Sequence, residues 1–422
     1  RLMQDCLRAN KDRMIDRFEA YQRLASMADW YQNHPESLIY ASNQFLADLL
    51  VWYHLSWMAE SVQRSDARVV ALREKASNFT LHDRRELLQI ILEQLQSVIP
   101  RYRKLAEDGQ VELCMSPYAH PIVPLLLDME SAREAMPDVH LPVTTEYPGG
   151  EARARWHLQK GLESFERVFG RTPVGLWPSE GGVSQQALDL FAEHDFRWVA
   201  SGGSVLGNSH DAHSKSCSHR VYRFGDTKIN CVFRDDGLSD LIGFNYSDWH
   251  SEDAVANLIG HMEHISDLCP DRDDCIITII LDGENAWEYY PENAWYFLDH
   301  LYRGLLDNAK LELATVGDFI AQCNPRPEQA ERLVAGSWVY GTFSTWIGSP
   351  EKNRGWDLLV EAKHCYDEVV ASSKLNPQQL SDASRQLAIC EGSDWFWWFG
   401  DYNPGPTVSQ FDQLYRMHLA HL

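Results

Sequence analysis

The sequence predicts an α/β fold in which a mainly parallel sheet lies between two helical regions. Residues 1–108 carry apolar side chains at helical spacing and no strong strand signal. From residue 111, short β-prone runs alternate with helical stretches, which is typical of βα units in a parallel sheet, either open or closed into a barrel. Beyond about residue 330 the pattern is helical again, and 324–327 is the best linker candidate.

The elements can be assigned in order along the chain. Helical spacing predicts N-terminal helices over 38–62 and 87–105, with a kink at Pro100. The expected strands are 111–115, 174–177, 198–200, 221–224, 229–233 and 276–281. The expected later helices are 151–168, 184–194, 254–268, 292–308, 353–372, 377–390 and 408–419. Residues 201–219, rich in Gly, Ser, His and Asn, predict a long surface loop.

Composition limits the class of partner. With 422 residues and a formal net charge of -23, the chain can bury a sizeable core but disfavours nucleic acid or an anionic membrane as a partner. A neutral or small substrate fits better. The 15 tryptophans can pack in cores or stack on sugar rings, and core packing is the commoner role. The most apolar early stretch, 45–58, is too short to span a bilayer.

Cysteine and histidine spacing predicts neither a disulfide framework nor a metal site. The nine cysteines are odd in number and scattered, without a CxxC pair, so reduced thiols in a cytoplasmic protein are expected. His210 and His213, like His261 and His264, are three residues apart, a spacing that one helix face could offer to a metal. No third ligand is apparent, so we expect surface histidines.

Glu180 is the first candidate for catalysis. A β-prone run stops at Pro178 and is followed by Glu180, two glycines and a helix. The carboxylate should therefore lie at the carboxyl end of a strand, beside a helix N-terminus that keeps it ionised, as a nucleophile must be. A helix-capping carboxylate is an equally good interpretation of this segment alone.

Asp282 is the second candidate. It directly follows the run 276–281, whose apolar residues and Thr278 predict a strand buried on both faces. Burial at the end of such a strand should raise the pKa of the carboxyl group, which suits a proton donor. A structural aspartate that caps the next turn is the alternative. Together, Glu180 and Asp282 form a plausible carboxylate pair in an α/β enzyme, and cleavage of a glycosidic bond needs such a pair.

Several longer motifs make the chain recognisable. They are 109–113 with 117–124, 175–184, 281–288, and 342–353 with Trp356 and Asp357. In these motifs, and in their order, the sequence resembles glycoside hydrolase family 57, the retaining α-glucan enzymes that include α-amylases and amylopullulanases. Two further stretches, 233–244 and 393–398, resemble segments that recur in the amylase-like branch of this family. The resemblance implies an irregular (β/α) barrel of about seven strands with helical insertions, followed by a helical C-terminal domain.

The resemblance also implies domain limits. We expect 1–330 to form an incomplete barrel domain with a helical region over 1–108, and 331–422 to form a helical domain that completes the active site. The family opens with a strand that carries a His-Gln-Pro motif, and the polar segment around His34 does not match it. We therefore expect roughly a hundred residues, with the first barrel strand, to precede Arg1 in the intact protein. The 422-residue chain alone should then be nearly inactive.

The resemblance assigns roles to individual residues. It implies Glu180 as nucleophile, Asp282 as general acid/base and His120 as a sugar contact, and its motifs suggest stacking or site-wall roles for tryptophans. The expected substrate-binding residues are His120, Trp177, Arg234, Asp235, Asp240, Glu284, Trp287, Trp346, Lys352, Asn353 and Asp394. Trp395, Trp397 and Trp398 could form a sugar platform or a core plug.

Two residues depart from the family pattern. Gly182 stands where serine is expected, and it should be tolerated because only a hydroxymethyl group is lost. Asp236 stands where histidine is more common, which puts one subsite contact in doubt.

The expected function is hydrolysis of α-1,4 linkages in starch, glycogen or maltodextrins through a covalent glycosyl intermediate, with α-1,6 linkages as a further candidate substrate. This chemistry needs no cofactor, and the resemblance implies no metal. One alternative is a 4-α-glucanotransferase or branching enzyme that uses the same intermediate. Another is a glucan-binding protein without catalysis. The Trp-Pro-Ser-Glu sequence that ends at Glu180 is closer to the amylase branch, which disfavours the transferase. Both carboxylates are retained, which disfavours a protein without catalysis.

Overall fold

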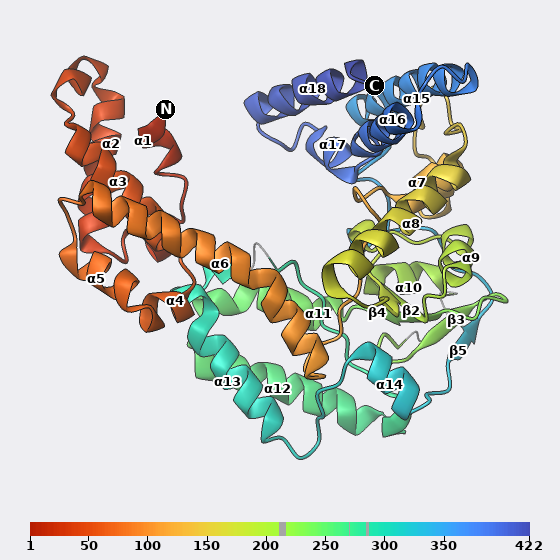
Figure 1. Cartoon of the computed structure of the whole chain (residues 1–422). Coiled ribbons are helices and arrows are strands. Elements are labelled where there is room, and N and C mark those ends of the chain that lie inside the picture. The colour runs from red at the N-terminus through yellow and green to blue at the C-terminus, as the bar shows by residue number, and fades with distance from the viewer. Residues whose placement is uncertain (211–216, 270, 284–286) are drawn as a thin grey trace. The chain divides into compact units, whose positions relative to one another are not determined.

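The computed structural model describes residues 1–210, 217–269, 271–283 and 287–422, which form two compact units (Figure 1). The helical unit consists of Arg1–Lys104, Gly237–Asp267 and Leu281–Leu313. The sheet unit consists of Leu105–Asp236, Leu268–Ile280 and Ala314–Leu422. The predicted fold class is confirmed, because the chain is α/β with a largely parallel sheet and a helical C-terminal region.

The helical unit joins the N-terminal helices to two helices from the middle of the chain. Its main helices are α1 (Leu2–Asp5), α2 (Glu19–Asn33), α3 (Asn43–Ser56), α4 (Glu60–Ser65), α5 (Ala67–Lys75), α6 (Leu81–Glu107), α12 (Ser251–Leu268) and α13 (Trp295–Leu306). Tyr21, Leu49 and Ile90 are buried in its core. The buried Asp48 carboxylate accepts the Phe79 N–H at 2.9 Å and so stabilises the turn that leads into α6.

The sheet unit is built on five strands in the described residues, in the order β1-β2-β4-β3-β5. The strands are β1 (Gly175–Leu176), β2 (Trp198–Ser201), β3 (Tyr222–Phe224), β4 (Asn230–Phe233) and β5 (Glu328–Ala330). The pairs β1–β2, β2–β4 and β3–β5 are parallel, and β3–β4 is antiparallel. Every residue of β2 and β4 is buried, which explains why these strands appear in the sequence as continuous apolar runs.

Helices that follow the strands supply the rest of the sheet's core. They include α8 (Gly150–Phe169), α9 (Gln185–Glu193) and α10 (Gly203–Ser209). Ser184 caps the N-terminus of α9 with a hydrogen bond from the Ala187 N–H. Because α10 occupies part of 201–219, with Val205 and Leu206 buried, the prediction of one long loop there is wrong for 203–209; residues 211–216 lie outside the described residues.

Two expected strands differ from the structure. In 111–115 only Met115 forms a bridge, to Leu176 of β1. Residues 276–281, all described, form no strand, and Thr278 alone among them is buried. The run is apolar, but none of its residues is paired in a strand; the Thr278 carbonyl accepts the Asp235 N–H at 2.8 Å. Conversely, β5 was missed because its side chains are largely exposed and give no hydrophobic signal.

The C-terminal helices belong to the same unit as the sheet. They are α15 (Pro350–Ala371), α16 (Pro377–Cys390), α17 (Ser393–Trp398) and α18 (Gly405–Ala420), which Figure 1 shows packed together. They share a core with α7 (Val123–Leu127), in which Trp356 stacks on Phe396 with ring centroids 4.2 Å apart. Asn376 begins α16 with a capping box, so the predicted boundary at this helix is confirmed.

The cysteines differ from expectation at one place. Cys269 and Cys275 form a disulfide, whereas reduced thiols were expected throughout. The two cysteines are six residues apart, a separation that a spacing rule based on CxxC does not detect. The other cysteines, all within the described residues, are free thiols. None of the described helices combines the length and apolar character needed to cross a membrane.

Candidate active site

Glu180 lies on a tight turn at the carboxyl end of β1. Residues Ser179–Gly181 form a single 3-10 turn between β1 and α9, and Glu180 and Gly181 have φ values of 56° and 59°. A side-chain-bearing residue keeps this left-handed conformation only where surrounding contacts enforce it. Glycine is required at 181, because a Cβ there would also come within 3.0 Å of the Trp177 ring. The turn therefore presents Glu180 in one defined backbone conformation.

Trp338 holds both ends of Glu180. Its Nε1–H donates to Glu180 Oε2 at 2.9 Å, and its backbone N–H donates to the Glu180 carbonyl at 3.2 Å. The Trp338 and Trp177 rings meet edge to face, with centroids 5.3 Å apart. The half-buried carboxylate thus lies beside an aromatic wall, a combination suited to a sugar ring. Sequence reasoning missed Trp338, although it precedes the motif 342–353 by only four residues.

Arg234 brings a positive charge to the same wall. Its guanidinium lies 5.5 Å from the centroid of the Trp338 ring, and its Nε donates to the Ile280 carbonyl at 2.9 Å. Its Nη1 lies 3.1 Å from Asp236 Oδ1. Asp236 also accepts the Ser204 N–H at 3.1 Å at the start of α10. The aspartate that replaces the more usual histidine therefore anchors Arg234 and ties β4 to α10.

Asp235 is paired with a histidine that the sequence did not single out. Asp235 Oδ2 lies 2.7 Å from His219 Nε2, and His219 Nδ1 lies 3.7 Å from Cys217 Sγ. Burial favours a lower pKa for His219, but hydrogen bonds to Asp235 and Cys217 outweigh burial and raise the pKa to about 9. The raised pKa favours the protonated imidazole, which can form an ion pair with Asp235.

His120 lies in a strained loop against the C-terminal helices. Ala119 and His120 have φ values of 58° and 60°. His120 Nδ1 is 2.8 Å from Ser393 Oγ, and the Ser393 N–H donates to the His120 carbonyl at 2.9 Å. Further along the loop, Ile122 Cγ2 would lie 3.5 Å from a Cβ added to Gly182. The loop that carries His120 therefore packs against the turn that carries Glu180.

Other candidates in the sheet unit make contacts within the protein. Trp346 is fully buried, and Asn353 bonds to the His140 carbonyl and the Gly348 N–H, both at 2.9 Å. Lys352 is buried and donates to the Phe396 carbonyl at 2.7 Å and to the Tyr402 hydroxyl at 2.9 Å. Burial lowers the pKa of Lys352 to about 8. These contacts stabilise the C-terminal helices, while Asp394 is exposed on α17.

The tryptophans after Asp394 have different environments. Trp395 is buried in the C-terminal core and donates to the Ile389 carbonyl at 2.7 Å. Trp398 stacks on Phe411 with ring centroids 4.6 Å apart, while Trp397 is exposed. Of the two interpretations of this cluster, the core plug applies to Trp395.

Three expected site residues belong to the helical unit. Asp240 and Asp282 are exposed, and the half-buried Trp287 ring lies 5.7 Å from that of Tyr290. The expectation that burial desolvates Asp282 is wrong for this structure, because no buried strand precedes it. Glu284 lies outside the described residues. Among the described residues, no group of three His, Cys, Asp or Glu side chains could hold a metal ion.

Comparison with known proteins concerns the family and the fold of the chain. No curated protein matches the chain in sequence. In fold, it is similar to a branching enzyme from the hyperthermophilic archaeon Pyrococcus horikoshii, with a TM-score of 0.60 and 18% identity, over 90% of this chain and 75% of that one. A branching enzyme from Thermococcus kodakaraensis, in complex with glucose, gives a TM-score of 0.60 at 15% identity, over 89% and 77% of the two chains.

An α-amylase from Thermotoga maritima is similar as well, with a TM-score of 0.58 and 12% identity, over 89% of this chain and 79% of that one. At these identities the likeness concerns the fold. The sequence profile described as glycosyl hydrolase family 57 matches residues 13–330. With the motifs, the sheet and the fold in agreement over most of its length, the chain belongs to glycosyl hydrolase family 57.

Proposed function

We propose that the protein hydrolyses α-1,4 linkages in glucans by a retaining mechanism, with Glu180 as nucleophile. One observation carries this proposal: the Glu180 carboxylate is presented on a left-handed turn at a strand end and is held there by the Trp338 N–H at 2.9 Å. A carboxylate fixed in this way needs little reorganisation before it attacks a sugar. An N–H donor also stabilises the ionised form of a carboxylate.

In the proposed reaction, Glu180 attacks the anomeric carbon while Asp282 protonates the leaving oxygen. Asp282 then removes a proton from water, which attacks the glycosyl–Glu180 ester and releases the sugar with retained configuration. Trp177 and Trp338 offer their ring faces and edges to the sugar, and His120 contacts a hydroxyl group. We propose sugar contacts also for Arg234, Asp240 and Asp394, and assign positioning roles to the buried Trp346 and Lys352.

Transfer to a second sugar hydroxyl is the alternative fate of the same intermediate. The similar solved structures include branching enzymes and a 4-α-glucanotransferase, so an acceptor glucan could take the place of water. Water and an acceptor sugar compete for the glycosyl–Glu180 ester, and the outcome makes the protein a hydrolase or a transferase. This outcome depends on the residues around the ester rather than on Glu180 itself.

Product analysis with the intact protein tests the proposal. With end-labelled maltooligosaccharide, we expect reducing ends to increase in step with shorter labelled products. Longer chains at a constant number of reducing ends would instead identify a transferase, and new α-1,6 linkages would identify a branching enzyme. If the unmodified protein binds maltooligosaccharide no better and no worse than Glu180→Gln and forms no new product, the proposal of catalysis is wrong.

The hydrogen bond from Trp338 gives a separate prediction. Trp338→Phe keeps an aromatic ring but removes the Nε1–H donor to Glu180. Without this donor the carboxylate is no longer held in the orientation for attack, and loss of such positioning should lower kcat/KM by about 10- to 100-fold. Steady-state kinetics measure this, with the exposed Trp30→Phe as the matched control. Unchanged kcat/KM in Trp338→Phe would show that this donor has no part in the reaction.

A further inference from the structure

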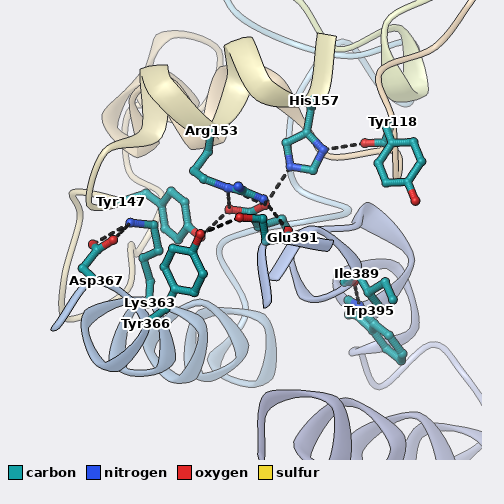
Figure 2. A network of polar contacts seen from close by, with 11 residues as sticks. Tyr118, Tyr147, Arg153, His157, Lys363, Tyr366, Asp367, Ile389, Glu391 and Trp395 are labelled. Atoms are coloured by element: carbon teal, nitrogen blue, oxygen red, sulfur yellow. Dashed lines mark hydrogen bonds and ion pairs between the residues drawn. The ribbon is translucent and has the colours of Figure 1, made fainter. Parts of the chain in front are cut away.

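Glu391 is a buried carboxylate at the end of α16, remote in sequence from both proposed catalytic residues. It is 0% exposed and accepts hydrogen bonds on both oxygens (Figure 2). The Tyr147 hydroxyl donates to Oε1 at 2.6 Å, and Arg153 donates from Nε to Oε1 at 2.8 Å and from Nη2 to Oε2 at 2.7 Å. His157 Nε2 lies 2.7 Å from Oε2. Glu391 is thus fully enclosed by donors.

The cluster keeps Glu391 ionised. Burial on its own favours a higher pKa for Glu391, but His157 and Arg153 outweigh burial and lower the pKa to about 2. Taking charges out of water is expensive, and a buried ion pair is weak evidence for added stability. Such a cluster is better explained by the geometry that it imposes on the segments it joins.

One of those segments is the loop that carries His120. His157 Nδ1 is hydrogen-bonded to the Tyr118 carbonyl, and the Tyr118 N–H donates to the His157 carbonyl at 3.1 Å. Both ring nitrogens of His157 therefore lie within hydrogen-bond distance of oxygen atoms, one from the Tyr118 carbonyl and one from the Glu391 carboxylate. Through His157, the Glu391 carboxylate fixes the peptide two residues before His120.

The other segment runs from Glu391 to Ser393, directly beside residues 118–120. A Cβ on Gly392 would lie 2.9 Å from the Ala119 carbonyl oxygen, so only glycine allows this approach of the two backbones. Ser393 then bonds to both the backbone and the ring of His120. The left-handed backbone of Ala119 and His120 persists because contacts on both sides enforce it.

We propose that Glu391, held by Tyr147, Arg153 and His157, is a positioning residue that sets the orientation of the His120 imidazole through Ser393 and the 118–120 backbone. The inference rests on the proposed function, in which His120 contacts the sugar. Ser393 binds His120 Nδ1 at 2.8 Å, which fixes the rotation of the ring about its χ angles. The imidazole is thereby oriented before glucan arrives.

A double-mutant cycle on kcat/KM tests this in the intact protein. Ser393→Ala and Glu391→Gln should each lower kcat/KM by about 10- to 100-fold, as expected for a misplaced substrate contact. In a His120→Ala background, Ser393→Ala should change kcat/KM by less than about 2-fold, because the group that it orients is gone. The exposed Glu163→Gln on α8 is the matched control for Glu391→Gln. Multiplicative effects of Ser393→Ala and His120→Ala would overturn the inference.

A second measurement does not depend on activity. The 15N resonances of the His120 imidazole, assigned by their loss in His120→Gln, should shift in Ser393→Ala and in Glu391→Gln but not in Glu163→Gln. If Glu391→Gln fails to fold, Ser393→Ala still reports on the ring. Unshifted resonances overturn the positioning role even when Glu180→Gln abolishes glucan cleavage. Shifted resonances in a protein whose Glu180→Gln variant stays fully active support the positioning contact and overturn the proposed function.

Discussion

Replacing Glu180 with glutamine is expected to abolish glucan cleavage while leaving the fold and glucan binding largely intact. The amide is no nucleophile, so kcat should fall by at least about 10³-fold. The glutamine side-chain carbonyl can still accept the Trp338 N–H that now reaches Glu180 Oε2 at 2.9 Å, which preserves the turn. Steady-state kinetics and isothermal titration with maltooligosaccharide measure the two effects separately. Glu166→Gln, an exposed glutamate on α8, is the matched control.

The backbone of Glu180 suggests a further variant that tests its role directly. Because φ is 56° at this position, glycine fits without strain, and Glu180→Gly opens a space beside the anomeric carbon. Azide can enter that space from the nucleophile's face, so an activated α-glycoside should yield the β-glycosyl azide, with inverted configuration.

The Glu180→Gln variant also has an outcome that would contradict the assignment. Turnover above about a tenth of the wild-type value would place the nucleophile elsewhere.

The parts of the site that could be predicted depend on local signals. The strands β1 to β4 were found because buried parallel strands give short apolar runs, and the turn at Glu180 was found because Pro178 and two glycines interrupt such a run. The same rule failed at 276–281. An apolar run reports a tendency to be buried, whereas a strand also needs a regular ladder of backbone hydrogen bonds, and residues 276–281 are not part of one.

The parts that were missed are long-range pairs of polar groups. Trp338 binds Glu180 across 158 residues, and His157 binds Glu391 across 234 residues. Nothing in the spacing of either residue indicates its partner, since the contact arises only when separate segments fold together. The contacts of Lys352 likewise could not be predicted from its place in the sequence. It lies within a motif and was expected to bind substrate, but its ammonium group is bonded to a backbone carbonyl and a tyrosine hydroxyl.

Asp282 is the remaining half of the proposed pair, and its substitution should separate the two steps of the reaction. Asp282→Ala removes the proton donor, so kcat on maltooligosaccharides should fall by about 10²- to 10⁴-fold. An aryl glycoside with a good leaving group needs little protonation, so its first step should stay fast and the glycosyl–Glu180 ester should accumulate as a burst of released phenol.

Asp282 is exposed in the structure, so its replacement should disturb stability little, and the exposed Asp253→Asn on α12 controls for loss of charge. Azide needs no general base, so it should accelerate breakdown of the ester in Asp282→Ala and give the α-glycosyl azide, with retained configuration. Glu180→Gly should instead give the β-glycosyl azide. Because the two products differ in configuration, the roles of Glu180 and Asp282 can be tested independently. If Asp282→Ala lowered the rates on aryl glycosides and maltooligosaccharides equally and azide had no effect, another residue would be the acid/base.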